Sequence, residues 1–127
     1  MNEKRGRCLK ILVVDDSKLA RTFLIKTLRE FEPRSEIYEA ENGQIAVDLY
    51  KELRPSAVFL DLTMPIMDGY EALRHIISFD VAAQVVVVSA DVQVQAQEMV
   101  IELGAKMMVP KPINSDKMLS ILGKLSI

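Results

Sequence analysis

The sequence predicts an α/β fold in which five parallel strands form one sheet with helices on both faces. The chain has 127 residues, the size of one domain with a core of its own. Short apolar runs alternate five times with segments whose apolar residues recur at helical spacing. No linker or low-complexity segment interrupts this alternation. Strict strand–helix alternation favours parallel strands with right-handed crossovers, and the helices then cover both faces.

The first half of the chain carries three expected strands and two expected helices. The first strand is a nearly continuous apolar run, as in a strand buried on both faces, and the second alternates like an edge strand. Both helices repeat apolar residues every three to four positions. In order, these elements are expected at Leu9–Val14, Ser17–Phe31, Glu36–Glu41, Gly43–Leu53 and Ala57–Leu60.

The second half continues with three helices and two strands. The stretch QVVVV is the most strand-like of the chain, and Gly104 stops the helix that follows it. Asn114 or Ser115 is expected to cap the last helix. In order, these elements are expected at Tyr70–Phe79, Gln84–Val88, Val94–Leu103, Met107–Val109 and Ser115–Leu125.

Composition excludes several classes of protein. The formal net charge is −2, which gives no sign of binding to nucleic acid or to a membrane surface. One cysteine, Cys8, excludes an intrachain disulfide and a cysteine-based metal cluster. The apolar run Ile11–Val14 is too short to span a bilayer, so a cytoplasmic protein is expected. Residues 1–8 are expected to be a short tail and residues 9–127 the domain.

Polar residues follow four of the five strands. Asp15 and Asp16 follow the first strand, Asp61 the third, Ser89 the fourth and Lys111 the fifth. Ligands of such sheets bind beyond the carboxyl ends of the strands. If the first and third strands are neighbours, three carboxylates converge there and need a cation to stay ionised. Carboxylate oxygens suit Mg²⁺, with Mn²⁺ possible, and the lysine is a second cation.

These residue types together indicate phosphoryl transfer. A divalent ion and a lysine neutralise the transferring group, a hydroxyl binds one of its oxygens, and a carboxylate can form an aspartyl-phosphate. Asp61 is the best nucleophile candidate because it stands alone at a strand end, whereas Asp15 and Asp16 are adjacent. Each residue taken singly also has a structural interpretation, such as Asp16 capping the first helix. Their convergence at one end of the sheet favours a functional site over these separate structural roles.

Four segments carry a resemblance to a known family. They are ILVVDDS at 11–17, VFLDLTMPIMDGYEAL at 58–73, VVVVSAD at 85–91 and GAKMMVPKPI at 104–113. In order and spacing, the sequence resembles the receiver domain of two-component response regulators, most closely the single-domain chemotaxis-regulator type. The resemblance implies a flavodoxin-like (βα)5 fold with strand order 2-1-3-4-5. It makes residues 9–127 the receiver domain.

The resemblance also implies a role for each residue at the acidic end. Asp61 would be the phospho-acceptor, and Asp16 and Asp61 would ligate Mg²⁺ directly. Asp15 would assist through water, and the backbone carbonyl of Thr63 would be a further ligand.

Two more positions would take part in switching. Ser89 would follow the phosphoryl group on activation, and Lys111 would pair with phosphate, aimed by a cis Lys111–Pro112 peptide bond. The family usually has an aromatic switch residue where this chain has Met108, so Met108 is a candidate switch of a different kind.

The implied function is a phosphorylation-activated signalling switch rather than an enzyme with an external substrate. A sensor histidine kinase would donate the phosphoryl group. A downstream effector protein or a phosphatase would bind the face formed by the fourth helix, fifth strand and fifth helix. The candidates for that face are Val92, Gln95, Met99, Lys106, Met108 and Met118. Core packing is the alternative for the valine and the methionines. A monomer or weak dimer is expected.

Two alternatives belong to other classes. An aspartate-nucleophile phosphohydrolase of the haloacid-dehalogenase type would place its nucleophile after the first strand, whereas Asp61 follows the third. A receiver-like adaptor that is never phosphorylated would usually lack an acid or the lysine, and this chain has all of them.

Overall fold

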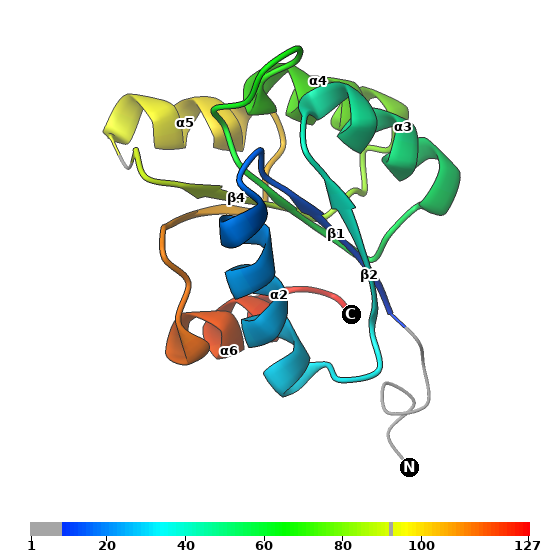
Figure 1. Ribbon diagram of the computed structural model, residues 1–127. Helices are drawn as coiled ribbons and strands as arrows, with labels where there is room; N and C mark the ends of the chain where they lie inside the picture. Colours follow the sequence, from blue (N-terminus) through cyan, green and yellow to red (C-terminus); the bar gives the residue numbers. More distant parts are fainter. Residues whose placement is uncertain (1–8, 92) are drawn as a thin grey trace.

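Five parallel strands form one sheet in the order β2-β1-β3-β4-β5 (Figure 1). The computed structural model describes residues 9–91 and 93–127, so the expected tail at 1–8 lies outside the described residues. The fold is the flavodoxin-like α/β fold that the sequence indicates. The strands are β1 (Lys10–Val14), β2 (Glu36–Ala40), β3 (Ala57–Leu60), β4 (Val85–Ser89) and β5 (Met107–Pro110).

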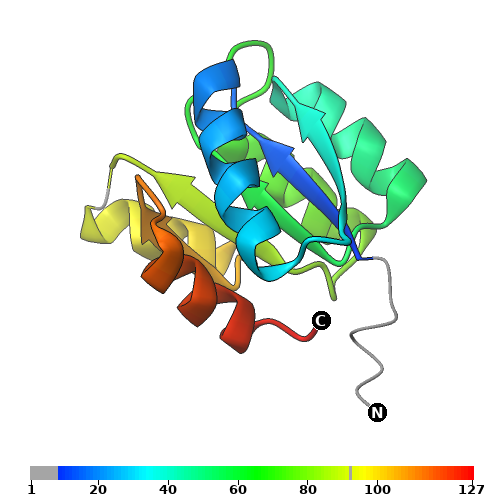
Figure 2. The same cartoon turned by 60° about the horizontal axis from the view of Figure 1, so that its bottom comes forward.

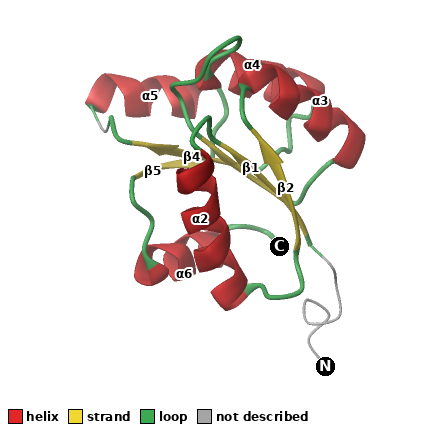
Figure 3. Cartoon of the chain, in the orientation of Figure 1, coloured by secondary structure: helices red, strands yellow, loops and turns green. Residues whose placement is uncertain are grey.

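Five helices cover both faces of the sheet, as predicted (Figures 1 and 3). Figure 2 shows α2 and α6 lying over one face, and α3, α4 and α5 cover the other. The helices are α2 (Lys18–Phe31), α3 (Gly43–Leu53), α4 (Gly69–Phe79), α5 (Val94–Glu102) and α6 (Ser115–Lys124).

The side chains of each central strand divide between two cores. Along β1, Leu12 and Val14 enter the core under α3, α4 and α5, whereas Ile11 and Val13 enter the core under α2 and α6. Successive side chains of a strand point to opposite faces, so a strand between two helical layers is apolar at every position. This arrangement explains the continuous apolar runs of the sequence.

Side-chain caps begin four of the five helices. Ser17, Asn42, Asp68 and Asn114 each accept a hydrogen bond from the backbone N–H three residues later. Ser17 is thus the cap of α2 and not its first helical residue, and Asn114 caps α6. The other predicted element ends either coincide with the observed ends, as for α3 and β3, or differ by one residue, as where β4 runs to Ser89 instead of Val88.

The loop between β3 and α4 lies tightly against the end of β3. The N–H of Gly69 donates to the carbonyl of Leu62 over 2.9 Å, and a Cβ at Gly69 would overlap the backbone oxygen of Asp61. Glycine is therefore required at this position because the backbone itself fills the space of a side chain.

Replacing Gly69 by Ala should displace this loop and destabilise the protein by about 1–3 kcal/mol, the usual cost of an overpacked site. Gly123→Ala is a matched control, because nothing lies within 4 Å of a Cβ at that α6 position. The control should be neutral or slightly stabilising, since Ala favours a helix more than Gly does. Urea unfolding measures both. Equal stability of the two variants would contradict the role assigned to Gly69.

Candidate functional site

Three carboxylates converge where β1 and β3 end. The strands are neighbours, with Val14 opposite Leu60, so Asp15 and Asp61 emerge side by side. One carboxylate oxygen each from Asp15, Asp16 and Asp61 lies within 4.8 Å of the others. Asp15 and Asp61 are buried, whereas Asp16 is exposed. The predicted convergence is therefore present.

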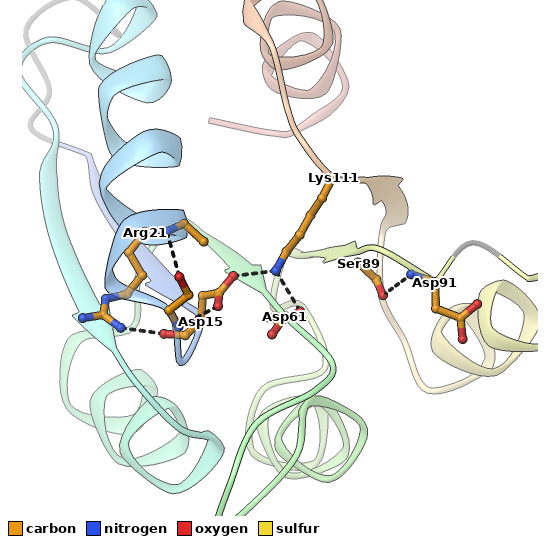
Figure 4. Close-up of polar contacts among 8 residues, drawn as sticks. Asp15, Arg21, Asp61, Ser89, Asp91 and Lys111 are labelled. Carbon is orange, nitrogen blue, oxygen red and sulfur yellow. Dashed lines mark hydrogen bonds and ion pairs between the residues drawn. The ribbon is translucent and has the colours of Figure 1, made fainter.

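Lys111 reaches this cluster from the end of β5 (Figure 4). Its Nζ lies 2.7 Å from Oδ2 of Asp15 and 3.2 Å from Oδ1 of Asp61. Its backbone N–H donates to the carbonyl of Ser89 over 3.0 Å, which ties the β5 end to the β4 end. The Lys111–Pro112 peptide bond is cis, in agreement with the expectation from the sequence.

Burial and neighbouring charges together shift the pKa values of Asp61 and Lys111. Burial raises the pKa of Asp61, the nearby Asp15 charge raises it further, and Lys111 only partly offsets the two. Burial by itself lowers the pKa of Lys111, but the hydrogen bond to Asp15 and the charges of both carboxylates outweigh it, so the pKa of Lys111 is raised. One cation faces two buried anions, so the cluster has room for further positive charge.

Both oxygens of the Asp15 carboxylate already have protein partners. Oδ1 accepts from the backbone N–H of Ser17 over 2.9 Å, and Oδ2 accepts from Lys111. The backbone N–H of Asp15 donates to the carbonyl of Ala40 over 3.1 Å. Asp15 is thus fixed as part of the scaffold of the site.

Ser89 lies at the end of β4, and its hydroxyl is directed into the following loop (Figure 4). The Oγ of this buried residue accepts a hydrogen bond of 3.0 Å from the backbone N–H of Asp91. Thr63 is exposed in the loop after Asp61.

Residues expected on the partner face differ in exposure, and one of them, Val92, lies outside the described residues. Met99 and Lys106 are exposed, and Met108 is half-buried against the core under α3, α4 and α5. Met118 is fully buried in the core under α2 and α6, so its assignment to the partner face is wrong. Its position on α6 faces the sheet, which the spacing of methionines alone does not reveal.

One basic residue of the site was not singled out from the sequence. Arg21, in α2, donates a hydrogen bond of 2.7 Å from Nη1 to the backbone carbonyl of Asp15 (Figure 4). In sequence it is one of several basic residues on a helix, and a partner on the backbone leaves no signature in residue type.

A groove of about 570 Å³ opens beside the cluster, between α2 and the loop that leads into α6. Asp15, Asp61 and Lys111 line its polar part, and Leu19 and Phe23 lie along its apolar part. Leu19 is 82% exposed, so the groove presents apolar surface next to the carboxylates.

Comparisons with known proteins place the chain in a family. A model of the response regulator receiver domain matches residues 11–123. The chain belongs to the response regulator receiver domain family. The chemotaxis protein CheY of Listeria monocytogenes is 42% identical over 91% of this chain and 97% of its own length. CheY of Bacillus subtilis is 38% identical over 91% and 95%, respectively.

A solved structure of the same type matches most of the receiver domain. The CheX–CheY–BeF3–Mg²⁺ complex from Borrelia burgdorferi superimposes with a TM-score of 0.82 at 33% identity, over 96% of this chain and 92% of that chain. The protein is thus a CheY-like receiver domain, a type consistent with a phosphorylation-activated switch, and nothing found favours the phosphohydrolase alternative.

Receiver domains generally bind Mg²⁺ at an acidic pocket, and the cluster here fits that ion. Its donors are oxygens of Asp15, Asp16 and Asp61, without nitrogen or sulfur ligands from the described residues. Among residues 9–91 and 93–127, no helix is both long and apolar enough to cross a membrane.

The raised pKa of Asp61 predicts a pH-dependent stability. A carboxyl whose folded pKa is raised stabilises the folded state at low pH, and this contribution is lost as pH rises through the folded pKa. In chelator-treated buffer at pH 7, Asp61→Asn should therefore be more stable than wild type, by on the order of 1 kcal/mol. The difference should shrink as pH falls toward about 4. Thermal unfolding across pH measures this; a less stable variant at pH 7 would contradict it.

Proposed function

We propose that this receiver domain accepts a phosphoryl group on Asp61 from a sensor histidine kinase and passes the signal on by protein–protein contact. The observation that carries the proposal is the buried Asp61 at the end of β3, held beside Lys111 and two further carboxylates. Its activity would be confined to its own phosphorylation and dephosphorylation. We expect it to act in the cytoplasm as a monomer or weak dimer.

Asp61 and Lys111 have separate roles in the proposed phosphoryl transfer. An oxygen of Asp61 attacks the phosphorus of a phosphohistidine, a P–O bond forms, and the P–N bond breaks as the imidazole leaves with the electron pair. Bound Mg²⁺, or Mn²⁺, would neutralise charge on the phosphoryl oxygens. Lys111, already 3.2 Å from Asp61, supplies the second cation for the same oxygens.

The proposed metal roles follow the family resemblance and the contacts of each carboxylate. Asp15 has both oxygens occupied by Ser17 and Lys111, so it suits a contact through water. On the pattern of the family, Asp16 and Asp61 are proposed as the direct ligands, with the Thr63 carbonyl as a further ligand in the loop; Oδ1 of Asp61 also contacts Lys111. The groove beside α2 would give a phosphorylated histidine side chain a path to Asp61.

Ser89 and Met108 are the proposed switch. On phosphorylation, the Ser89 hydroxyl would leave the Asp91 N–H and donate to a phosphoryl oxygen, which moves the loop before α5. Met108, half-buried on β5 opposite Val87 of β4, could then change its packing. The α5–β5–α6 face would shift toward a state preferred by an effector or phosphatase.

The acceptor assignment predicts that acetyl phosphate and Mg²⁺ add one base-labile phosphoryl group to wild type and none to Asp61→Asn. Intact-mass spectrometry before and after mild base measures it, with Asp91→Asn as an exposed control that should label normally. Labelling of Asp61→Asn at the wild-type level would refute the assignment.

The metal assignment predicts that Asp16→Ala weakens Mg²⁺ binding by more than about tenfold, since a direct ligand is lost. Asp91→Ala should change it little, because the Asp91 carboxylate accepts from the Gln93 N–H instead. Calorimetric titration with MgCl2 compares the two, and equal affinities would show that Asp16 is not a ligand.

A further inference from the structure

Arg21 contacts the acidic site from the side opposite Lys111. Its Nη1 donates to the Asp15 carbonyl over 2.7 Å, and its Nε donates to Oε1 of Glu39 over 2.8 Å, near the end of β2. The side chain of Arg21 is only 11% exposed. Asp15 therefore lies between two cations, Arg21 on its backbone and Lys111 on its carboxylate (Figure 4).

The carbonyl that Arg21 binds belongs to the peptide group joining Asp15 to Asp16. A peptide group is planar, so holding its oxygen also fixes the direction of the N–H and Cα of Asp16. The Asp16 side chain is exposed, unlike those of Asp15 and Asp61, so burial does not hold it. Its direction toward the cluster depends on the backbone that precedes it.

We propose that Arg21 is a positioning residue for the metal site, because its hydrogen bond to the Asp15 carbonyl determines where the Asp16 carboxylate lies. This inference rests on the proposed function, since it assumes that Asp16 is a ligand. Glu39 completes the arrangement. It fixes the second edge of the planar guanidinium and offsets its charge beside three carboxylates.

Glu39 contributes mainly orientation. Its side chain is 46% exposed, and ion pairs of that exposure add little to stability. The hydrogen bond from Arg21 to the partly buried carbonyl of Asp15 is the contact that orients the site.

Positioning and simple electrostatics predict opposite results when Arg21 becomes neutral. A cation near the carboxylates repels Mg²⁺, so removing only its charge would strengthen metal binding. If Arg21 positions Asp16, its removal weakens Mg²⁺ binding by about 10- to 100-fold, as for other residues that hold ligands in place.

The test is calorimetric titration of wild type, Arg21→Met and Arg29→Met with MgCl2 at constant ionic strength. Arg29 is a matched control on the same helix, because its Nη1 donates to the Ser35 carbonyl over 3.2 Å, at the opposite end of the sheet. Arg29→Met should bind Mg²⁺ like wild type and Arg21→Met more weakly. Thermal unfolding without Mg²⁺ verifies that both variants are folded.

Arg21→Lys provides the test if the methionine variant does not fold. It keeps the charge but has no planar fork to hold Asp15 and Glu39 together. Electrostatics then predicts unchanged Mg²⁺ affinity, and positioning predicts weaker binding.

Wild-type affinity in Arg21→Lys, or unchanged or tighter binding in Arg21→Met, would overturn the inference. Absence of Mg²⁺ binding in wild type would instead overturn the proposed function, so the two failures are distinguishable.

Discussion

The contact of one ammonium group with two buried carboxylates supports the whole acidic end of this fold. Parallel pairing of β1 and β3 forces Asp15 and Asp61 together, and a buried charge without a partner costs several kcal/mol. Lys111, which follows β5 two strands away from β3, compensates the negative charge of both carboxylates. It can do so because its own N–H is bonded to Ser89 at the end of β4. The sheet thus creates the charge conflict and also supplies the residue that relieves it.

Much of the fold was predictable because apolar periodicity reports burial directly. The alternation of continuous runs and helical spacing located all ten elements, but the order of the strands came from the family resemblance and not from periodicity. Element ends were less predictable, since they depend on local hydrogen bonds. Ser17 has extended backbone and caps α2, so the helix begins at the next residue. Ser89 pairs with Pro110, so β4 extends to Ser89.

The candidate site was predictable where side chains meet one another and unpredictable where they meet the backbone. Asp15, Asp61 and Lys111 are recognisable by residue type and position. Arg21 is not, because its partner is a carbonyl that any residue would provide. Ile66 is a similar case: this 83% exposed β-branched residue adopts φ 70° in the loop after Asp61. Such backbone is strained for isoleucine, and nothing in the sequence indicates it.

The outer strand β5 limits how other chains can associate with the sheet. A free strand edge is a template for pairing with another molecule, and long flat edges promote aggregation. β5 has only four residues, Met107–Pro110, and a very short strand offers few groups to a pairing chain. The N–H groups of Lys106 and Lys111, which flank β5, point inward and donate to Val85 and Ser89 of β4. Strand addition at this edge is therefore limited to a few backbone hydrogen bonds, and recognition there relies more on side chains, which can discriminate between partners.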